Sequence, residues 1–209
     1  QGGILAAIGV GNIERSTDTH PFDPRFNPKV VKWLNWDVTE SNNSITMTTQ
    51  HTFAEWSYTL SRKITLNENT LSSTTSISCL GKRALPIKWF PHPFFPIPLQ
   101  DELCTTDFPI SFTPNAAYTL KQNTIKRKQA FTWPQGAYQV VDFDLPSNAP
   151  CSVRQNHPHC QELRVSTDYT PSFFPIWGNQ NCFSFEPYIE LVLNLGQSKA
   201  WEINYTFHN

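Results

Sequence analysis

Two side chains that can transfer protons stand out in the sequence, His92 and Glu186. His92 lies in the stretch Trp-Phe-Pro-His-Pro-Phe-Phe, residues 89–95, between two prolines. Each proline fixes its own φ and disfavours the α conformation for the residue before it, so we expect a stiff, extended backbone at His92. Imidazole readily gives and takes protons near neutral pH, so this histidine suits a general acid or base as well as a half-buried packing residue.

Glu186 ends the segment Cys-Phe-Ser-Phe-Glu, residues 182–186, and a proline follows it. Alternation along a strand would place Cys182, Ser184 and Glu186 on one face and the two phenylalanines on the other. A carboxylate among aromatic side chains is costly unless it is paired or used, and desolvation raises its pKa toward the range of a general base. The alternative is an acid at a strand end that is hydrogen-bonded to a neighbouring loop.

The composition limits the classes of ligand. The chain has 209 residues, a length that an all-β sandwich can use as one domain. Its 16 basic residues balance 17 acidic ones, so we expect no nucleic-acid or membrane partner but a neutral or locally recognised ligand. No apolar run is long enough to span a membrane, and residues 2–11 lack the basic leader of a signal peptide. Because the sequence begins with Gln1, we expect a chain that was processed or cut from a longer one.

The five cysteines are odd in number, and none forms a Cys-x-x-Cys pair. This pattern does not fit a secreted disulfide scaffold, so we expect a reducing, cytoplasmic compartment. The run His-Pro-His-Cys, residues 157–160, offers metal-ligand types, but no second cluster with ligand spacing accompanies it. We therefore predict a polar turn there and no metal site.

The elements that must position His92 and Glu186 are predicted to be strands. The chain contains 17 Pro, 15 Phe, 7 Trp and 6 Tyr, which favour strands and loops over helices. Alternating apolar and polar residues predict the strands 44–50, 56–66, 71–80 and 84–90, then 118–120, 129–133, 138–143, 162–167, 173–177, 182–186 and 199–207. Residues 94–114 and 146–158 are expected to be irregular. One short helix is predicted at residues 29–33, after Asn27-Pro28. The whole is predicted to be all-β, mostly antiparallel, with little helix.

These motifs resemble the aldose 1-epimerase, or galactose mutarotase, superfamily. The resemblance rests on His-Pro-Phe-Phe at 92–95, Ile-Trp-Gly at 176–178, Phe-Ser-Phe-Glu-Pro-Tyr at 183–188 and the closing strand Trp-Glu-Ile-Asn-Tyr-Thr-Phe at 201–207. It runs from about residue 56 to the end of the chain and includes the strand pair that precedes the histidine. It implies one β-supersandwich domain over residues 1–209 that lacks part of the usual N-terminal region.

The resemblance also implies an activity and a set of site residues. His92 would donate a proton to the ring oxygen of an aldohexose, and Glu186 would remove the proton from the anomeric hydroxyl. The ring opens and recloses, which interconverts the α and β anomers without a cofactor. The ligand would be a monosaccharide or a sugar phosphate. Further sugar contacts are expected from Arg15, His20, Asp142 and Trp177, with Asp144 and Trp89 as alternatives for the last two.

Three other functions remain open at this point. The first is a hexose-6-phosphate mutarotase, for which Lys82, Arg83 and Lys88 could supply a cationic pocket. The second is a non-catalytic carbohydrate-binding module on the same fold. The third is a sugar lyase on a similar sandwich, which would need a tyrosine or metal arrangement that the sequence does not supply.

Overall fold

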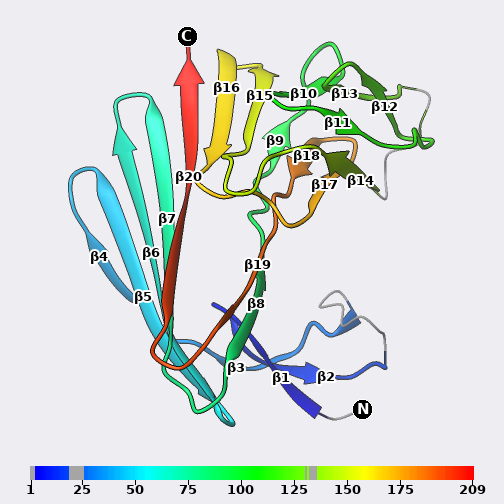
Figure 1. Ribbon diagram of the computed structural model, residues 1–209. Coiled ribbons are helices and arrows are strands. Elements are labelled where there is room, and N and C mark those ends of the chain that lie inside the picture. Colours follow the sequence, from blue (N-terminus) through cyan, green and yellow to red (C-terminus); the bar gives the residue numbers. More distant parts are fainter. Residues whose placement is uncertain (1–2, 19–25, 130, 132–135) are drawn as a thin grey trace. The chain divides into compact units, whose positions relative to one another are not determined.

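The computed structural model describes residues 3–18, 26–129, 131 and 136–209. Within these ranges the regular secondary structure is almost entirely antiparallel β-strand, arranged in sheets of three, ten, five and two strands (Figure 1). The predicted all-β fold class is therefore confirmed. No helix in the described ranges is long and apolar enough to cross a membrane.

The chain divides into two compact units. The first contains residues 1–63, 75–85 and 192–200, and the second contains residues 64–74, 86–191 and 201–209. Each unit buries apolar side chains of its own. One domain over residues 1–209 stays a prediction.

The first unit contains a small sheet and a meander. The small sheet has the order β1 (Gly3–Ala7), β2 (Gly11–Arg15), β3 (Val30–Trp33). The meander contains β4 (Asp37–Glu40), β5 (Ser44–Phe53), β6 (Trp56–Asn67) and β7 (Thr70–Cys79), of which the last two continue into the second unit. The alternation that predicted strands from residue 44 onward is confirmed here.

A buried histidine links the small sheet of this unit to the meander through hydrogen bonds. His51 on β5 is only 5% exposed. Its Nε2 lies 2.9 Å from Oδ1 of Asn12 and its Nδ1 lies 3.2 Å from the hydroxyl of Tyr58, which itself accepts the Gly9 N–H at 3.3 Å. An amide oxygen only accepts, so Nε2 must carry the proton and Nδ1 accepts from Tyr58. The network holds a neutral imidazole.

The second unit contains the elements around the predicted site. One sheet portion has the order β12 (Tyr118–Lys121), β13 (Thr124–Arg127), β10 (Glu102–Thr106), β15 (Ser152–His157), β16 (Cys160–Thr167), β20 (Ser198–His208). A second sheet has the order β11 (Ile110–Ser111), β14 (Ala137–Phe143), β17 (Phe174–Gly178), β18 (Cys182–Phe185), β9 (Phe95–Pro96). A separate pair consists of β8 (Leu85–Trp89) and β19 (Ile189–Leu193). Three of these strands extend into the first unit, which contains Leu85 of β8, residues 192–193 of β19 and residues 198–200 of β20.

Apolar side chains from both sheets of this unit form its core, as expected for a β-sandwich. The long sheet contributes Leu103, Ile125, Val153 and Ile203, and the shorter one contributes Val141, Phe174, Ile176, Phe183 and Phe185. All of these are at most 2% exposed.

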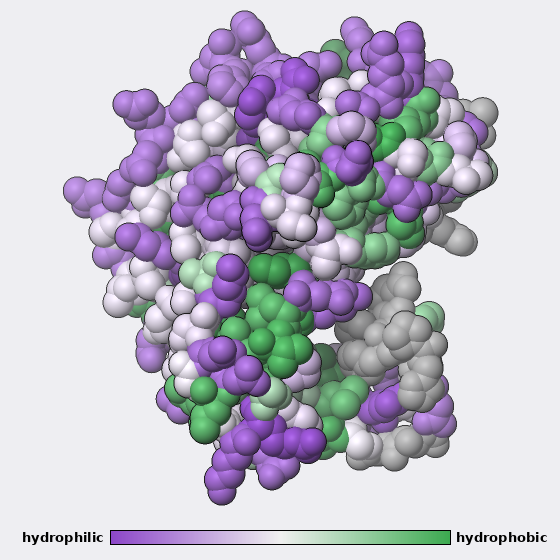
Figure 2. Space-filling model, viewed as in Figure 1, coloured by the Kyte–Doolittle hydropathy of each residue, from purple (hydrophilic) through white to green (hydrophobic). Residues whose placement is uncertain are grey.

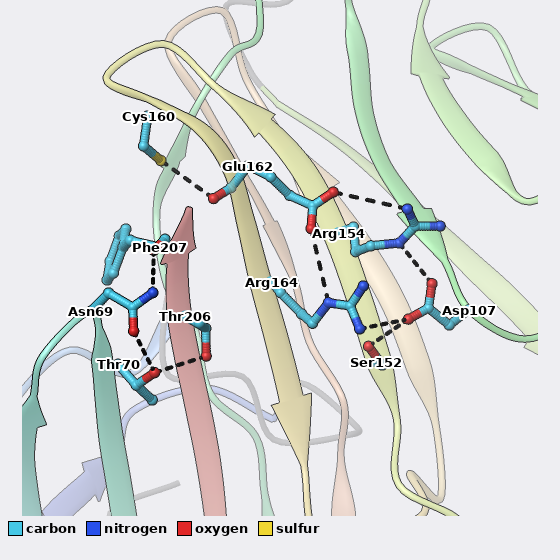
Figure 3. A network of polar contacts seen from close by, with 10 residues as sticks. All are labelled: Asn69, Thr70, Asp107, Ser152, Arg154, Cys160, Glu162, Arg164, Thr206 and Phe207. Atoms are coloured by element: carbon cyan, nitrogen blue, oxygen red, sulfur yellow. Dashed lines mark hydrogen bonds and ion pairs between the residues drawn. The ribbon is translucent and has the colours of Figure 1, made fainter. Parts of the chain in front are cut away.

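The other face of the long sheet in this unit is polar. Figure 2 shows hydrophilic residues gathered where β15 and β16 lie. Asp107 accepts from Arg154 Nε at 2.7 Å and from Ser152 at 2.8 Å, and Arg164 lies 3.7 Å away (Figure 3). Glu162 lies 3.9 Å from each guanidinium. These charges satisfy one another, which is typical of a solvated sheet face.

Three local predictions are wrong. Residues 30–33 form β3 and not a helix, because two adjacent β-branched valines favour a strand and β2 supplies hydrogen-bond partners. Asn27 does not cap a helix; its Oδ1 accepts the N–H groups of Ser16 and Thr17 at 2.9 and 3.0 Å.

The other two wrong predictions concern stretches expected to be irregular. Residues 94–114 contain β9, β10 and β11, and residues 146–158 contain β15. Their prolines lie mostly between short strands rather than within them, so local composition hid the strands. The strand predicted at 129–133 falls partly outside the described residues; Gln129 and Phe131 are not in a strand.

The His51 network predicts sensitivity to acid. Burial, and secondarily the charge of Lys32, lower the pKa of His51 below its usual value. The native state therefore binds fewer protons than the unfolded state, so this contribution to the free energy of unfolding is present above the unfolded pKa of about 6.5 and is lost as pH falls.

We expect His51→Gln to lower the free energy of unfolding near pH 8. We also expect this free energy to fall less steeply in the variant than in the wild type between about pH 8 and pH 5, where unfolded histidine titrates. Urea unfolding of both proteins across this range measures the two slopes. Parallel curves would contradict a role for His51 in acid sensitivity.

Candidate active site

His92 lies in the connection from β8 to β9, and Glu186 directly follows β18. Pairing of β9 with β18, with Phe95 opposite Phe183, brings the two connections together. His92 Nε2 lies 3.4 Å from Oε1 of Glu186. The histidine side chain is 38% exposed and the glutamate side chain 6%. Two groups that are far apart in the sequence thus form one acid–base pair that solvent reaches from the histidine side.

Aromatic rings surround the imidazole. The ring centroids of Phe94, Trp177 and Phe90 lie 4.7, 5.6 and 6.0 Å from that of His92. Phe90 also stacks on Tyr188 at 4.3 Å. Phe94 is 65% exposed, so this wall does not close over the pair. Such rings can pack against the apolar face of a small ligand while the His–Glu pair meets its polar edge.

The alternation of β18 places Glu186 on the face that carries the site. Phe183 and Phe185 point the other way and pack against Phe95, with centroids 5.5 and 4.9 Å apart. Ser184, opposite Trp177, has the orientation of Glu186. The Glu186 N–H donates to the carbonyl of Pro175 at 2.9 Å, which fixes the backbone where the strand ends.

Burial sets the protonation behaviour of this site. It raises the pKa of the Glu186 carboxyl to about 7. Burial also raises the pKa values of the Tyr138 and Tyr188 phenols, and the nearby Glu186 carboxylate raises both further. The carboxyl can therefore exchange its proton near neutral pH, while both phenols keep theirs.

A glycine holds the indole of Trp177. The φ of Gly136 is +76°, in the left-handed region that favours glycine. A Cβ on Gly136 would lie 3.0 Å from both Cζ2 and Nε1 of Trp177. The backbone before β14 therefore packs directly against the ring that faces His92.

The other predicted sugar contacts are Arg15, His20, Asp142 and Trp177, with Asp144 and Trp89 as alternatives for the last two. Arg15 ends β2 in the first unit, where its Nε donates to the carbonyl of Thr17 at 3.2 Å. His20 lies outside the described residues. Asp142 is exposed on β14, opposite Ser111, and Asp144 is an exposed residue just after that strand. Trp89 packs against Trp201 at 5.3 Å, in contrast to Trp177, which contacts His92.

Two of the three candidate phosphate-binding cations are paired with carboxylates. Arg83 lies 3.4 Å from Glu55 in the first unit. Lys88 lies 2.6 Å from Glu190 in the second unit, with its Nζ over the ring of Tyr188. Pairing reduces the positive charge available to a phosphate.

The histidine-rich run forms a turn between β15 and β16. The His159 N–H donates to Nδ1 of His157 at 3.2 Å, and Cys160 begins the next strand. Among the described residues, no group of three or more His, Cys, Asp or Glu side chains is arranged to hold a metal ion.

Comparisons with known proteins concern the fold. No family model matches the sequence, and no curated protein matches it. Among solved structures, a proposed aldose 1-epimerase from Escherichia coli K12 matches with a TM-score of 0.63 and 14% identity, over 98% of this chain and 78% of that one. The chain has the galactose mutarotase-like fold. The predicted fold is thereby confirmed.

Two further structures with the galactose mutarotase-like fold agree. A galactose mutarotase related enzyme from Lactobacillus acidophilus matches with a TM-score of 0.57 and 14% identity, over 84% of this chain and 71% of that one. A galactose mutarotase-like protein from Lactobacillus casei ATCC 334 matches with a TM-score of 0.55 and 16% identity, over 83% and 73%. At these identities the likeness shows the fold alone, so any activity must be argued from the site.

The raised carboxyl pKa predicts that Glu186 costs stability. Its folded pKa, about 7, lies above the ordinary value of 4.5. The native state therefore binds more protons between these values, so this contribution to stability is present below about pH 4.5 and is lost as pH rises through about 7.

We expect Glu186→Gln to gain roughly 2 to 3 kcal/mol in free energy of unfolding relative to the wild type between about pH 4 and pH 8. Urea unfolding at a series of pH values measures this difference, with Glu162→Gln on the solvated sheet face as the control. If the free energies of unfolding of the wild type and Glu186→Gln differ by the same amount at every pH, the raised pKa of Glu186 is refuted.

Proposed function

We propose that the protein is an aldose 1-epimerase, an isomerase that interconverts the α and β anomers of a free aldohexose. The observation that carries this proposal is the His92–Glu186 pair, 3.4 Å apart and flanked by aromatic rings, in which burial raises the carboxyl pKa to about 7. Opening a hemiacetal needs one group to take a proton and another to give one. This pair offers both at one point.

The two roles follow from burial and access. Glu186, nearly buried, takes the proton of the anomeric hydroxyl, and the electrons of that O–H bond form the carbonyl at C1. The bond from C1 to the ring oxygen breaks, and His92 gives its proton to that oxygen. Both oxygens are attached to C1, so two groups in contact can serve them together. Rotation about the C1–C2 bond and closure with the roles reversed give the other anomer and restore both protons.

The remaining contacts complete a site for a monosaccharide. Trp177 offers an aromatic face beside His92 for the apolar side of the sugar ring. Asp142, on β14 of the same unit, is proposed from the family resemblance to bind a sugar hydroxyl. The chemistry is proton transfer alone, so the proposal includes no cofactor. We further propose a cytoplasmic location, in keeping with five free thiols.

Two of the alternative functions lose support from the site. A lyase would need a tyrosine that gives up its proton, whereas the pKa values of Tyr138 and Tyr188 are raised. A preference for sugar phosphates would need available cations, whereas Arg83 and Lys88 are paired with glutamates. A carbohydrate-binding module would share the aromatic wall, and it is distinguished from the enzyme only by measuring turnover.

Polarimetry of freshly dissolved α-glucose and α-galactose tests the proposal. We expect the intact protein to accelerate anomerisation, and His92→Asn and Glu186→Gln each to lower the rate by about 100-fold or more, the usual size of general acid–base effects. His157→Asn in the β15–β16 turn and Glu162→Gln on the polar sheet face make the same chemical changes elsewhere in the unit and should keep the rate.

The outcome separates the two remaining functions. If the intact protein binds sugar but does not accelerate anomerisation, its function is that of a carbohydrate-binding module and not of an epimerase. Acceleration that survives both site variants would refute the roles of His92 and Glu186.

A further inference from the structure

We propose that Tyr138 contacts the sugar and determines which hydroxyl epimers the site accepts. This inference rests on the proposed function and adds a residue that neither the sequence motifs nor the comparisons point to. Tyr138 lies on β14 directly opposite Trp177, and the Trp177 ring lies 5.6 Å from His92.

Strand register places Tyr138 on the face that carries the acid–base pair. Tyr138 is opposite Trp177, and Trp177 is opposite Ser184, so the three form one row across β14, β17 and β18. Neighbouring strands are about 4.8 Å apart, so this row spans about 10 Å, somewhat more than a pyranose ring. Glu186 lies one pleat beyond Ser184 on the same face. A sugar that meets Glu186 and stacks on Trp177 would therefore reach Tyr138 with its edge.

The Tyr138 phenol is available to a ligand. The residue is 48% exposed, and its hydroxyl has no hydrogen-bond partner within the part of the chain that the structure describes. Two buried tyrosines of the same unit differ: the Tyr118 hydroxyl donates to the carbonyl of Ala137 at 3.0 Å, and that of Tyr169 donates to the carbonyl of Pro187 at 2.9 Å. Tyr138 thus combines an exposed aromatic face with an unused polar end, a combination typical of binding sites.

Electrostatics assign this phenol a role as donor. Burial and the Glu186 carboxylate keep its pKa above the ordinary value, so it stays protonated throughout the neutral range. A neutral phenol beside a carboxylate cannot replace Glu186 as the base, but it can donate a hydrogen bond to a sugar hydroxyl. A fixed donor distinguishes an axial from an equatorial hydroxyl, because only one orientation reaches it.

The Tyr138→Phe variant tests this inference, since it removes only the hydroxyl. Initial anomerisation rates are measured by polarimetry for glucose, galactose and mannose; galactose and mannose each differ from glucose in the orientation of one hydroxyl. We expect kcat/KM for the best substrate to fall about 5- to 10-fold, mainly through KM, the size expected for one hydrogen bond. The kcat/KM values for the poorer epimers should change little, so the ratio of kcat/KM between the best and the poorer substrates falls. Tyr205→Phe on β20 makes the same change in the same unit and should leave the selectivity intact.

The outcomes separate this inference from the proposed function. Wild-type turnover with selectivity unchanged in Tyr138→Phe, or with an equal loss for all three sugars, overturns the inference and leaves the epimerase intact. If the wild type accelerates no aldose, the epimerase fails, and sugar binding followed by tryptophan fluorescence decides on Tyr138. Weaker binding of one epimer by Tyr138→Phe would then support the contact, and unchanged binding of all three would refute it.

Discussion

The site depends on the desolvation of one carboxyl group. Glu186 follows a strand whose alternate residues, Phe183 and Phe185, are locked into the core against Phe95. The core therefore fixes the direction of the Glu186 side chain, and the hydrogen bond from the Glu186 N–H to the Pro175 carbonyl fixes its backbone position. A surface glutamate would be fully ionised and a weak base at neutral pH. Burial brings the pKa of Glu186 to about 7, and the His92 imidazole lies 3.4 Å from its carboxyl group.

The neighbouring elements can be understood as meeting this requirement. Prolines on both sides of His92 restrict the backbone that carries the imidazole, and the aromatic wall keeps water from much of the carboxyl. Gly136 lets the chain pass close enough to hold Trp177 beside the pair. The cost falls on stability, because the native state must bury a group that ionises near neutral pH. Such opposition between stability and activity is common where catalysis needs a shifted pKa.

The sequence was sufficient for the fold class, and it singled out His92 and Glu186, which the structure brings to 3.4 Å from each other. Strand alternation and proline restriction are local properties, so both could be recognised without the fold. Prediction from the sequence failed where a segment becomes a strand only because a neighbouring strand pairs with it. Residues 30–33 become a strand through β2, and β15 forms between prolines because β10 and β16 flank it. His51 and Tyr138 carried no local signal: a buried network and a register across three strands depend on residues that only the fold brings together.

The most direct test of the central claim compares two pH titrations of the same protein. One is the pH dependence of kcat/KM for aldose anomerisation, and the other is the ¹³C NMR titration of the Glu186 side-chain carboxyl. The account predicts a carboxyl that titrates near pH 7 and a rising limb of kcat/KM with the same midpoint. A carboxyl that titrates near its ordinary value, or a rate that does not follow its ionisation, would contradict the assignment of Glu186 as the base.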